Sequence, residues 1–262
     1  MKILTIIIVH SFILWGVFSQ ILVAQPLTMG FLNTDAKPFK WKVEGEFVGP
    51  FLDIMRELEL RSGVSMQFEP LPMKRLLLYL ENGKIDGAFG LHKTPEREKI
   101  LIFFNTPIKW ITAHLFVKKG HSFQIKSLSD LSGKRVNLIR GTWYGEDFGR
   151  LIKQGKIEIK HAQDYDQLLQ MLISERVDFS VATTSVIQAY LSKKNNIYKE
   201  NIVMLPLVLY KPRPLYIVFS KASKLPHKYQ VINKINHALK EMETKNIFDK
   251  ITHPYGYTRF HQ

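Results

Sequence analysis

The stretch GAFGLHKTPEREK contains an arginine at a position that helices disfavour. Thr94 is typical of a helix N-cap and Pro95 of a first helical residue, which places Arg97 in the first turn. The unpaired N–H groups of that turn carry partial positive charge, so a cation there costs roughly 0.3–1 kcal/mol. The chemistry available to a guanidinium is bidentate hydrogen bonding to an anion. Arg97 therefore faces an anion, pairs with a neighbouring glutamate, or lies exposed on the surface.

Four carboxylates are candidates for acid or base chemistry. Asp86 and Asp178 accompany glycine or strand residues and are expected to tie turns, whereas Glu146 and Asp147 are expected to serve a helix N-terminus. No nucleophile, base and orienting group occur in a recognisable arrangement. The sequence therefore predicts no catalytic residues.

Metal ligands are not grouped either. The chain contains no cysteine, which excludes disulfides, thiolate metal sites and a cysteine nucleophile. His114 and His121 lack the spacing to other ligand-type residues that a metal site requires. We therefore expect no metal and no cofactor.

The net charge of +14 favours anionic partners of some kind. The lysines, however, are scattered, as in KQGKIEIK and SKKNNIYK, without the arginine and aromatic pattern of a nucleic-acid groove. They are expected to form solvated faces, and no nucleic-acid partner is predicted.

The first residues, MKILTIIIVHSFILWGVFSQILVAQP, have the order of a secretory signal peptide: Lys2, an apolar run, and Ala24 before Gln25. An uncleaved membrane anchor is the alternative, but polar residues interrupt the run and it falls short of a comfortable span. We expect a cleaved signal peptide over residues 1–24 and a periplasmic, cysteine-free protein that is not a lipoprotein.

After this segment, β-branched runs alternate with helical patterns, as in an α/β fold. The strands expected first are PLTMGFL, SMQFEPL and IDGAFGL, and the helices between them are GPFLDIMRELELRSG and MKRLLLYLENG. The first of these helices places Phe51, Met55 and Leu58 on one stripe, which predicts its buried face.

A second series begins near Ile111. Its expected strands are AHLFVKK, KRVNLIRG, KIEIKHA and VDFSVAT. Pro206, Pro212 and Pro214 then exclude one continuous central strand. A last long helix follows, in which apolar residues recur at helical spacing: Ile232, Ile235, Leu239 and Met242.

These segments, taken in order, resemble the bacterial periplasmic solute-binding proteins of the polar amino-acid type, the receptors of ABC importers. The resemblance covers almost the whole chain after the leader and rests most strongly on LENGKIDGAFGLHKTPEREKILIFF. EFVGPFLDIMREL, LSGKRVNLIRGT, ISERVDFSVATT and LYIVFSKAS support it by their order.

The resemblance implies a two-lobed periplasmic-binding fold of type II, in which lobe 2 is inserted into lobe 1. Lobe 1 is expected over residues 25–110 and 212–262, and lobe 2 over residues 111–211. Two connecting segments, near residues 108–114 and 207–213, are then expected to act as hinges.

The resemblance also implies a ligand site between the lobes, in which the arginine matching Arg97 grips a carboxylate. Gly141 and Thr142 follow a strand and precede a helix, so their amides and hydroxyl are expected to meet the same anion, although such a threonine often only caps its helix. Gly90 matches a position where backbone approaches the ligand, or is simply a turn glycine.

Four positions depart from the family pattern. Where amino-acid receptors present an aspartate to the α-ammonium, this chain has Thr183 or Thr184, and a hydroxyl does not replace that charge. Ala36 and Met73 stand where stacking aromatics are usual. His92 stands where a small hydroxyl residue is common.

Two further questions about the pocket stay open at this point. Trp110, Trp143 and Tyr144 either rebuild an apolar wall or pack within a hinge or lobe. Arg75 either adds a second cation at the cleft edge or is a surface arginine.

The sequence therefore predicts a monomeric protein that captures a small carboxylate-bearing or other anionic solute by hinge closure. This solute is an organic acid or is amino-acid-like, and an amino acid would be bound in an atypical way. Its partner would be an inner-membrane ABC permease or a receptor. The alternatives are a periplasmic dehydratase or lyase on the same fold, and a ligand sensor that acts with a separate membrane receptor.

Overall fold

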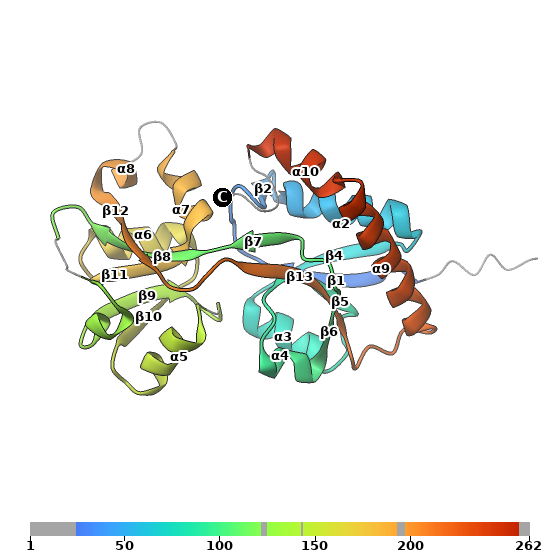
Figure 1. Cartoon of the computed structure of the whole chain (residues 1–262), viewed down its shortest axis with the longest axis horizontal. Helices are drawn as coiled ribbons and strands as arrows, with labels where there is room; N and C mark the ends of the chain where they lie inside the picture. Colours follow the sequence, from blue (N-terminus) through green and yellow to red (C-terminus); the bar gives the residue numbers. More distant parts are fainter. Residues whose placement is uncertain (1–24, 122–124, 143, 193–196, 257–262) are drawn as a thin grey trace, which may run out of the picture.

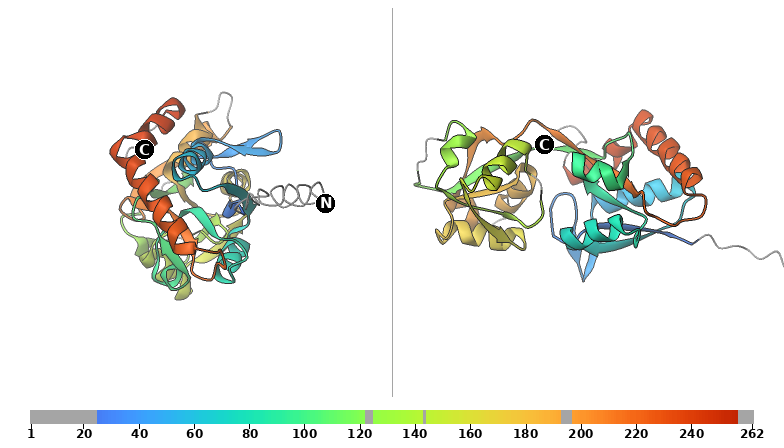
Figure 2. Two further views of the ribbon diagram at one scale, coloured as in Figure 1. Left: turned by 90° about the vertical axis from the view of Figure 1, so that its right-hand side faces the viewer. Right: turned by 90° about the horizontal axis from the view of Figure 1, so that it is seen from below.

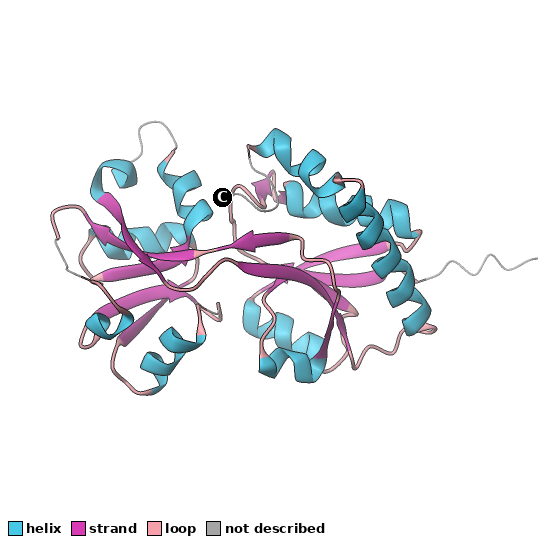
Figure 3. Cartoon of the chain, in the orientation of Figure 1, coloured by secondary structure: helices cyan, strands magenta, loops and turns pink. Residues whose placement is uncertain are grey.

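The computed structural model describes residues 25–121, 125–142, 144–192 and 197–256. Two α/β lobes lie side by side along the long axis of the molecule, and each has helices on both faces of one sheet (Figures 1 and 3). The view from below shows the same two bodies joined by extended segments (Figure 2). Within the described residues, no helix is long and apolar enough to cross a membrane.

Lobe 1 contains a sheet of order β4-β1-β5-β13-β6. The strands β1, β4 and β5 are parallel, and β13 runs antiparallel to β5 and β6. The bounds of its strands are β1 (Leu27–Leu32), β2 (Trp41–Val43), β3 (Glu46–Val48), β4 (Met66–Leu71), β5 (Gly87–Leu91), β6 (Leu101–Phe103) and β13 (Arg213–Ser220). Its helices are α2 (Pro50–Ser62), α3 (Met73–Glu81), α4 (Pro95–Ile100), α9 (Lys228–Thr244), α10 (Ile247–Thr252) and η2 (His253–Tyr255).

Lobe 2 repeats this arrangement, with a sheet of order β10-β9-β11-β8-β12. Here β9, β10 and β11 are parallel and β8 is antiparallel to β11 and β12. Its strands are β8 (Ala113–Lys118), β9 (Arg135–Ile139), β10 (Glu158–Ala162), β11 (Phe179–Thr183) and β12 (Ile202–Val208). Its helices are η1 (Leu128–Leu131), α5 (Glu146–Lys153), α6 (Tyr165–Ile173), α7 (Thr184–Leu191) and α8 (Ile197–Asn201).

The chain passes between the lobes twice, through two extended segments in contact with each other. β7 (Lys109–Ile111) leads into β8, and it pairs antiparallel with β13 on the return passage. Pro206 lies in the edge strand β12, beside a register irregularity, where a missing N–H is tolerated. Pro212 stands between the two strands and Pro214 inside β13, so the proline-rich segment forms two strands, one in each lobe.

The helix faces predicted from periodicity are buried as expected. Phe51, Met55 and Leu58 of α2 all lie in the core of lobe 1. So do the four apolar residues of α9: Ile232, Ile235, Leu239 and Met242. These stripes explain why α2 and α9 pack against each other on one face of the sheet (Figure 1).

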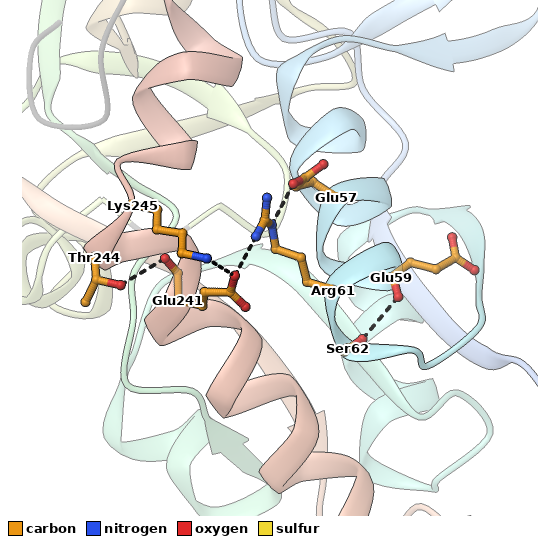
Figure 4. A network of polar contacts seen from close by, with 7 residues as sticks. All are labelled: Glu57, Glu59, Arg61, Ser62, Glu241, Thr244 and Lys245. Atoms are coloured by element: carbon orange, nitrogen blue, oxygen red, sulfur yellow. Dashed lines mark hydrogen bonds and ion pairs between the residues drawn. The ribbon is translucent and has the colours of Figure 1, made fainter.

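A polar network joins the same two helices at their outer edge (Figure 4). The guanidinium of Arg61 on α2 contacts Glu57 at 2.6 Å and Glu241 of α9 at 2.7 Å. Glu241 also accepts a hydrogen bond from Lys245 at 2.7 Å. Because these side chains are partly exposed, the network contributes modestly to stability and chiefly fixes how α9 lies on α2.

The predicted fold class is confirmed: two α/β lobes, the second inserted into the first, with two connecting segments. The short strands β2, β3, β6 and β7 and the short helices α8 and α10 were not predicted, because each is too brief to show a hydrophobic period. The exact lobe limits, 25–110 with 212–262 and 111–211, stay a prediction. The predicted signal peptide, residues 1–24, lies outside the described residues.

Candidate ligand-binding site between the lobes

A cavity of about 100 Å³ lies between the lobes, at the carboxyl ends of parallel strands from both sheets. Ligands of open α/β sheets bind at this edge because the connecting loops converge there. The lining from lobe 1 is Leu32, Thr34, Ala36, Phe39, Lys40, Phe51, Met73, Phe89, Gly90, Leu91, His92, Arg97 and Leu215. Lobe 2 and the crossing strand β7 add Ile111, Thr142, Tyr165, Thr183 and Val186.

Arg97 lies on α4, with its side chain in this cavity and only 8% of its surface exposed. Thr94 is the N-cap, and its hydroxyl accepts the backbone N–H of Arg97 at 3.3 Å, as the sequence predicts. One guanidinium nitrogen donates to the backbone carbonyl of His92 at 2.9 Å. Burial lowers the pKa of Arg97 to about 10, so the side chain remains charged at neutral pH.

Within the described part of the chain, no ion pair joins Arg97 to a carboxylate. Arg97 is therefore neither exposed nor paired with a neighbouring glutamate. Glu98 pairs instead with Lys93 at 2.8 Å. Glu96 is held by Thr94 and by its own backbone amide, which keep the pKa of that carboxyl low. The guanidinium therefore retains donors for a bound anion.

A second buried cation, Lys40, lines the same cavity and was not predicted. Its ammonium donates to the backbone carbonyl of Thr34 and lies 4.9 Å from the ring centre of Phe47 and 5.6 Å from that of Phe31. Burial lowers the pKa of Lys40 to about 7, and the charge of Asp35 partly opposes that shift. In the sequence Lys40 is one of three lysines within six residues, so its pattern is that of an exposed face.

His92 joins the cavity to the returning segment. Its Nδ1 is 3.0 Å from the carbonyl oxygen of Pro214 in β13, and a carbonyl can only accept, so Nδ1 carries the proton and Nε2 does not. Burial lowers the pKa of His92 to about 3, and the nearby charges of Arg97 and Arg213 add to that effect. The imidazole is therefore neutral at physiological pH.

The wall from lobe 2 is neutral and hydroxylated. Thr142 follows β9 and Thr183 ends β11, while Tyr165 begins α6. Burial raises the pKa of Tyr165 to about 12, against the opposing effect of a hydrogen bond with Thr183. These groups can donate or accept hydrogen bonds but carry no charge at neutral pH.

The two candidate threonines separate in the structure. Thr183 lines the cavity, whereas Thr184 turns toward the crossing segment, where its hydroxyl is 3.2 Å from that of Thr112 and 2.6 Å from Nδ1 of His114. Burial lowers the pKa of His114. Thr184 therefore belongs to the junction between the lobes and Thr183 to the cavity.

Two glycines mark close approaches at the cavity. Gly90 has φ +79°, and a Cβ there would lie 3.5 Å from the ring of Phe51. Gly141 has φ +78°, and its Cβ would approach Met73 of the other lobe to 2.9 Å. Gly141 does not itself line the cavity, but it allows lobe 2 to close on Met73.

Two phenylalanines that the sequence did not single out, Phe39 and Phe89, contribute to the apolar part of the cavity. Phe39 stacks on Phe51 with ring centres 5.1 Å apart, and Phe89 lies beside them. Met73 and Ala36 line the cavity in the places where aromatics are usual in the resembling family. Phe39 follows a proline in a short irregular segment, where no periodicity indicates its orientation.

The three aromatics proposed for an apolar wall lie elsewhere or are not described. Tyr144 is buried in the core of lobe 2, beside a neighbouring hollow of about 480 Å³ between α4 and α5. Trp110 belongs to the strand β7 and does not line the cavity. Trp143 lies outside the described residues. Arg75 is exposed on α3 and is likewise not part of the lining.

The candidate acids have the structural roles that were predicted for them. Asp86 accepts the amide of Thr28 at 3.0 Å and the hydroxyl of Ser223 at 2.6 Å. Asp178 binds Arg135 through both carboxylate oxygens. Glu146 and Asp147 lie in the first turn of α5.

The histidines are also apart from one another. His121 lies 3.7 Å from Glu175 on the surface of lobe 2, whereas His114 contacts Thr184 at the junction between the lobes. Among the described residues, no group of three or more His, Cys, Asp or Glu side chains is placed to hold a metal ion.

The charge of the cavity is one-sided. Of its described lining residues, Arg97 is charged at neutral pH, Lys40 is protonated in part because its pKa is about 7, and none is Asp or Glu. An adjoining hollow of about 410 Å³ shares Leu32, Thr34 and Met73 with it and adds Lys74 from lobe 1 and Arg140 from lobe 2. This hollow places two further basic residues beside the cavity that contains Arg97.

Comparisons with known proteins agree with this architecture. Residues 27–258 match the family described as bacterial extracellular solute-binding proteins, family 3, and the chain belongs to that family. The arginine-binding extracellular protein ArtP of Bacillus subtilis is 26% identical over 228 residues, which are 87% of this chain and 84% of that protein.

Two solved structures are similar over the same range. An ancestral arginine-binding protein bound to arginine is 28% identical with a TM-score of 0.75, and the match covers 88% of this chain and 98% of that one. An ancestral amino-acid-binding protein, described as a precursor of cyclohexadienyl dehydratase, is 25% identical with a TM-score of 0.70, over 88% and 96% of the two chains.

The protein is therefore an extracellular or periplasmic solute-binding protein with the fold of the amino-acid receptors that serve ABC importers. The names of its relatives give the class of solute as amino acids and do not single out an acid. The residues of the site must supply any finer statement.

Proposed function

We propose that this protein captures a small acidic solute between its lobes, with a carboxylate of the solute bound by Arg97. The observation that carries the proposal is the charge of the cavity: a buried guanidinium with no ion pair to a described carboxylate, in a lining without Asp or Glu. A bidentate contact to a carboxylate would satisfy the guanidinium donors that are left by its bond to His92.

The same observation argues against a cationic solute. Arginine, named for ArtP and for the ancestral arginine-binding protein among others, would bring a guanidinium and an ammonium beside Arg97 and Lys40. Like charges in a buried site repel, and a desolvated cation without a counterion costs several kcal/mol. An acid, with or without an α-ammonium, would meet complementary charge instead.

Binding is proposed rather than catalysis. A dehydratase or lyase needs an acid or base at the substrate. The cavity lining that the structure describes offers no carboxyl group, and the pKa of His92, about 3, makes its imidazole a poor proton acceptor at neutral pH. Lys40, with a pKa of about 7, could exchange a proton there, but no carboxylate of the described lining is available to act with it. Delivery of the solute to an ABC permease is the role proposed with it, as in the family.

The hydroxyl groups of lobe 2 are proposed to bind the solute when the two lobes close. Lobe 1 carries the charged groups, and Thr142, Thr183 and Tyr165 would add hydrogen bonds once lobe 2 closes. The closed form is then stabilised by the bound solute and can be recognised by a membrane partner.

The test begins with protein purified without refolding and examined by native mass spectrometry for a retained solute. Thermal unfolding is then followed with a panel of amino acids and organic acids, for the wild type, Arg97→Ala and Arg75→Ala. We expect an acid to raise the melting temperature of the wild type and of Arg75→Ala, whose exposed arginine is the matched control. Arg97→Ala should keep its circular dichroism spectrum and lose the shift.

The proposal fails if arginine or another cationic amino acid stabilises the protein more than any acid does. It also fails if Arg97→Ala retains the full shift with the acid that stabilises the wild type.

A further inference from the structure

Lys40 has surroundings that are unusual for a lysine. Lysine is rarely buried, yet only 6% of this residue is exposed, and its ammonium lies between two phenylalanine rings and one backbone carbonyl. That carbonyl occupies one of its three N–H donors. The described residues include no ion pair to Lys40, although the charge of Asp35 acts on it from nearby.

A purely structural role does not require the charge. The segment around Lys40 is already held by its backbone, since the Ala36 amide donates to the Lys40 carbonyl at 2.8 Å and the Lys40 amide to the Ala36 carbonyl at 3.2 Å. An apolar side chain could fill the space between Phe31 and Phe47 without the desolvation of an ammonium. A buried cation kept at the wall of a cavity is a candidate for function.

Lys40 and Arg97 are the lysine and the arginine of the described cavity lining. Both residues line the same cavity and belong to lobe 1, Lys40 on the segment after β1 and Arg97 on α4 after β5. Lobe 1 alone therefore presents two cationic groups to a solute before lobe 2 closes. A solute with a single carboxylate would satisfy one of them and leave the other buried beside it.

We propose that Lys40 binds a second anionic group of the solute, so that the ligand is a small molecule with two acidic groups. This inference rests on the proposed function, because it takes Arg97 as the partner of the first carboxylate. The ligand class is a short dicarboxylate, with or without an amino group. The Lys40 ammonium and the Arg97 guanidinium each neutralise one end of it.

The cavity size agrees with a short molecule. At about 100 Å³ it is below the 300–1,000 Å³ typical of sites for drug-sized ligands. The adjoining hollow with Lys74 and Arg140 would also attract a dianion more strongly than a monoanion, because the electrostatic interaction scales with the charge of the ligand.

The experiment compares matched acids by isothermal titration calorimetry. Succinate and glutarate are the dicarboxylate probes, aspartate and glutamate are their amino counterparts, and butyrate and pentanoate lack the second acid group. The proteins are the wild type, Lys40→Met, Lys40→Arg and Lys42→Met. Lys42 is the matched control, since it is an exposed lysine that lies 5.0 Å from the same Phe47 ring and outside the cavity lining.

We expect the wild type and Lys42→Met to bind at least one dicarboxylate tenfold or more tightly than the monocarboxylate of the same length. Lys40→Met should lose that preference and bind the two within about threefold of each other, whereas Lys40→Arg should retain part of it. Because the wild-type preference is itself a test, a variant that folds poorly does not leave the proposal undecided.

The proposal is overturned if the wild type shows no preference for the dicarboxylates, or if Lys40→Met keeps the preference. In those outcomes a dependence of monocarboxylate binding on Arg97 would leave the proposed function intact. Failure of all six acids to bind, together with binding of a cationic amino acid, would instead overturn the proposed function itself.

Discussion

The two lobes have the same strand arrangement but present different chemistry to the cavity between them. Lobe 1 contributes Arg97, Lys40 and the neutral His92, whereas lobe 2 contributes the hydroxyl groups of Thr142 and Thr183. The difference indicates a division of labour. In the proposed function, lobe 1 selects the solute by charge, and lobe 2 completes its hydrogen bonds on closure.

The largest effect is expected from removal of the charge at Arg97. Arg97→Ala should weaken acid binding by about 2–5 kcal/mol, the usual cost of removing one partner of a buried charged pair. Thr142→Ala in lobe 2 should cost only about 0.5–1.5 kcal/mol, as for a neutral hydrogen bond. Calorimetric titration of both variants measures the asymmetry, and equal losses would show that the lobes contribute alike.

The next effect concerns the stability of the unliganded protein. The pKa of Lys40 is lowered from 10.5 to about 7, so the unfolded chain holds this proton more tightly and the buried ammonium destabilises the fold. That cost is full below pH 7 and declines as the pH rises from 7 to 10.5. Lys40→Met should therefore raise the free energy of unfolding by about 1–3 kcal/mol at pH 6, after the loss of its hydrogen bond and ring contacts.

Denaturant unfolding of Lys40→Met and the wild type at pH 6 and pH 9.5 measures this difference. The gain of the variant should be largest at pH 6 and should shrink at pH 9.5. A variant less stable than the wild type at both pH values would show that Lys40 serves the fold rather than the solute.

A negative charge introduced on lobe 2 should reduce the difference in charge selection between the two lobes. Thr183→Asp would put a carboxylate opposite the two cations and weaken acid binding by about 1–3 kcal/mol, through repulsion of the solute in a partly desolvated site. Binding of arginine, which we expect to be absent in the wild type, should become measurable. Unchanged affinity for the acid would mean that Thr183 does not face the solute.

The smallest effect is expected at the adjoining hollow, which contains Lys74 and Arg140. The double change Lys74→Gln with Arg140→Gln should slow association of a dicarboxylate a few-fold at low salt and leave dissociation unchanged, because exposed charges act mainly on the encounter. Stopped-flow fluorescence at 20 and 300 mM salt tests this, and the difference should disappear at the higher concentration as screening increases.

The sequence predicts most of the architecture and part of the site. Long periodic segments such as α2 and α9 have one apolar face, so the residues that they bury follow from the spacing of their apolar side chains. Of the seven residues predicted for the site, all but Gly141 line the cavity, because the position of a loop after a strand determines where its residues gather. Their role in binding stays a prediction.

The sequence did not predict that Lys40 and Phe39 line the cavity. Both lie between β1 and β2, in a segment without helical or strand period, and a lysine beside other lysines favours exposure. Their burial depends on the packing of Phe31 and Phe47 from separate strands, which local pattern does not reveal. The same limit applies to Tyr144, whose burial in lobe 2 depends on tertiary contacts.

The most direct test of the account is a crystal structure of the protein with the solute that it retains or with the dicarboxylate that it binds most tightly. We predict a closed form in which one acid group of the solute makes two hydrogen bonds to the Arg97 guanidinium. A solute whose acid group contacts neither nitrogen of that guanidinium, or an Arg97 side chain turned out of the interlobe cavity, would contradict the account.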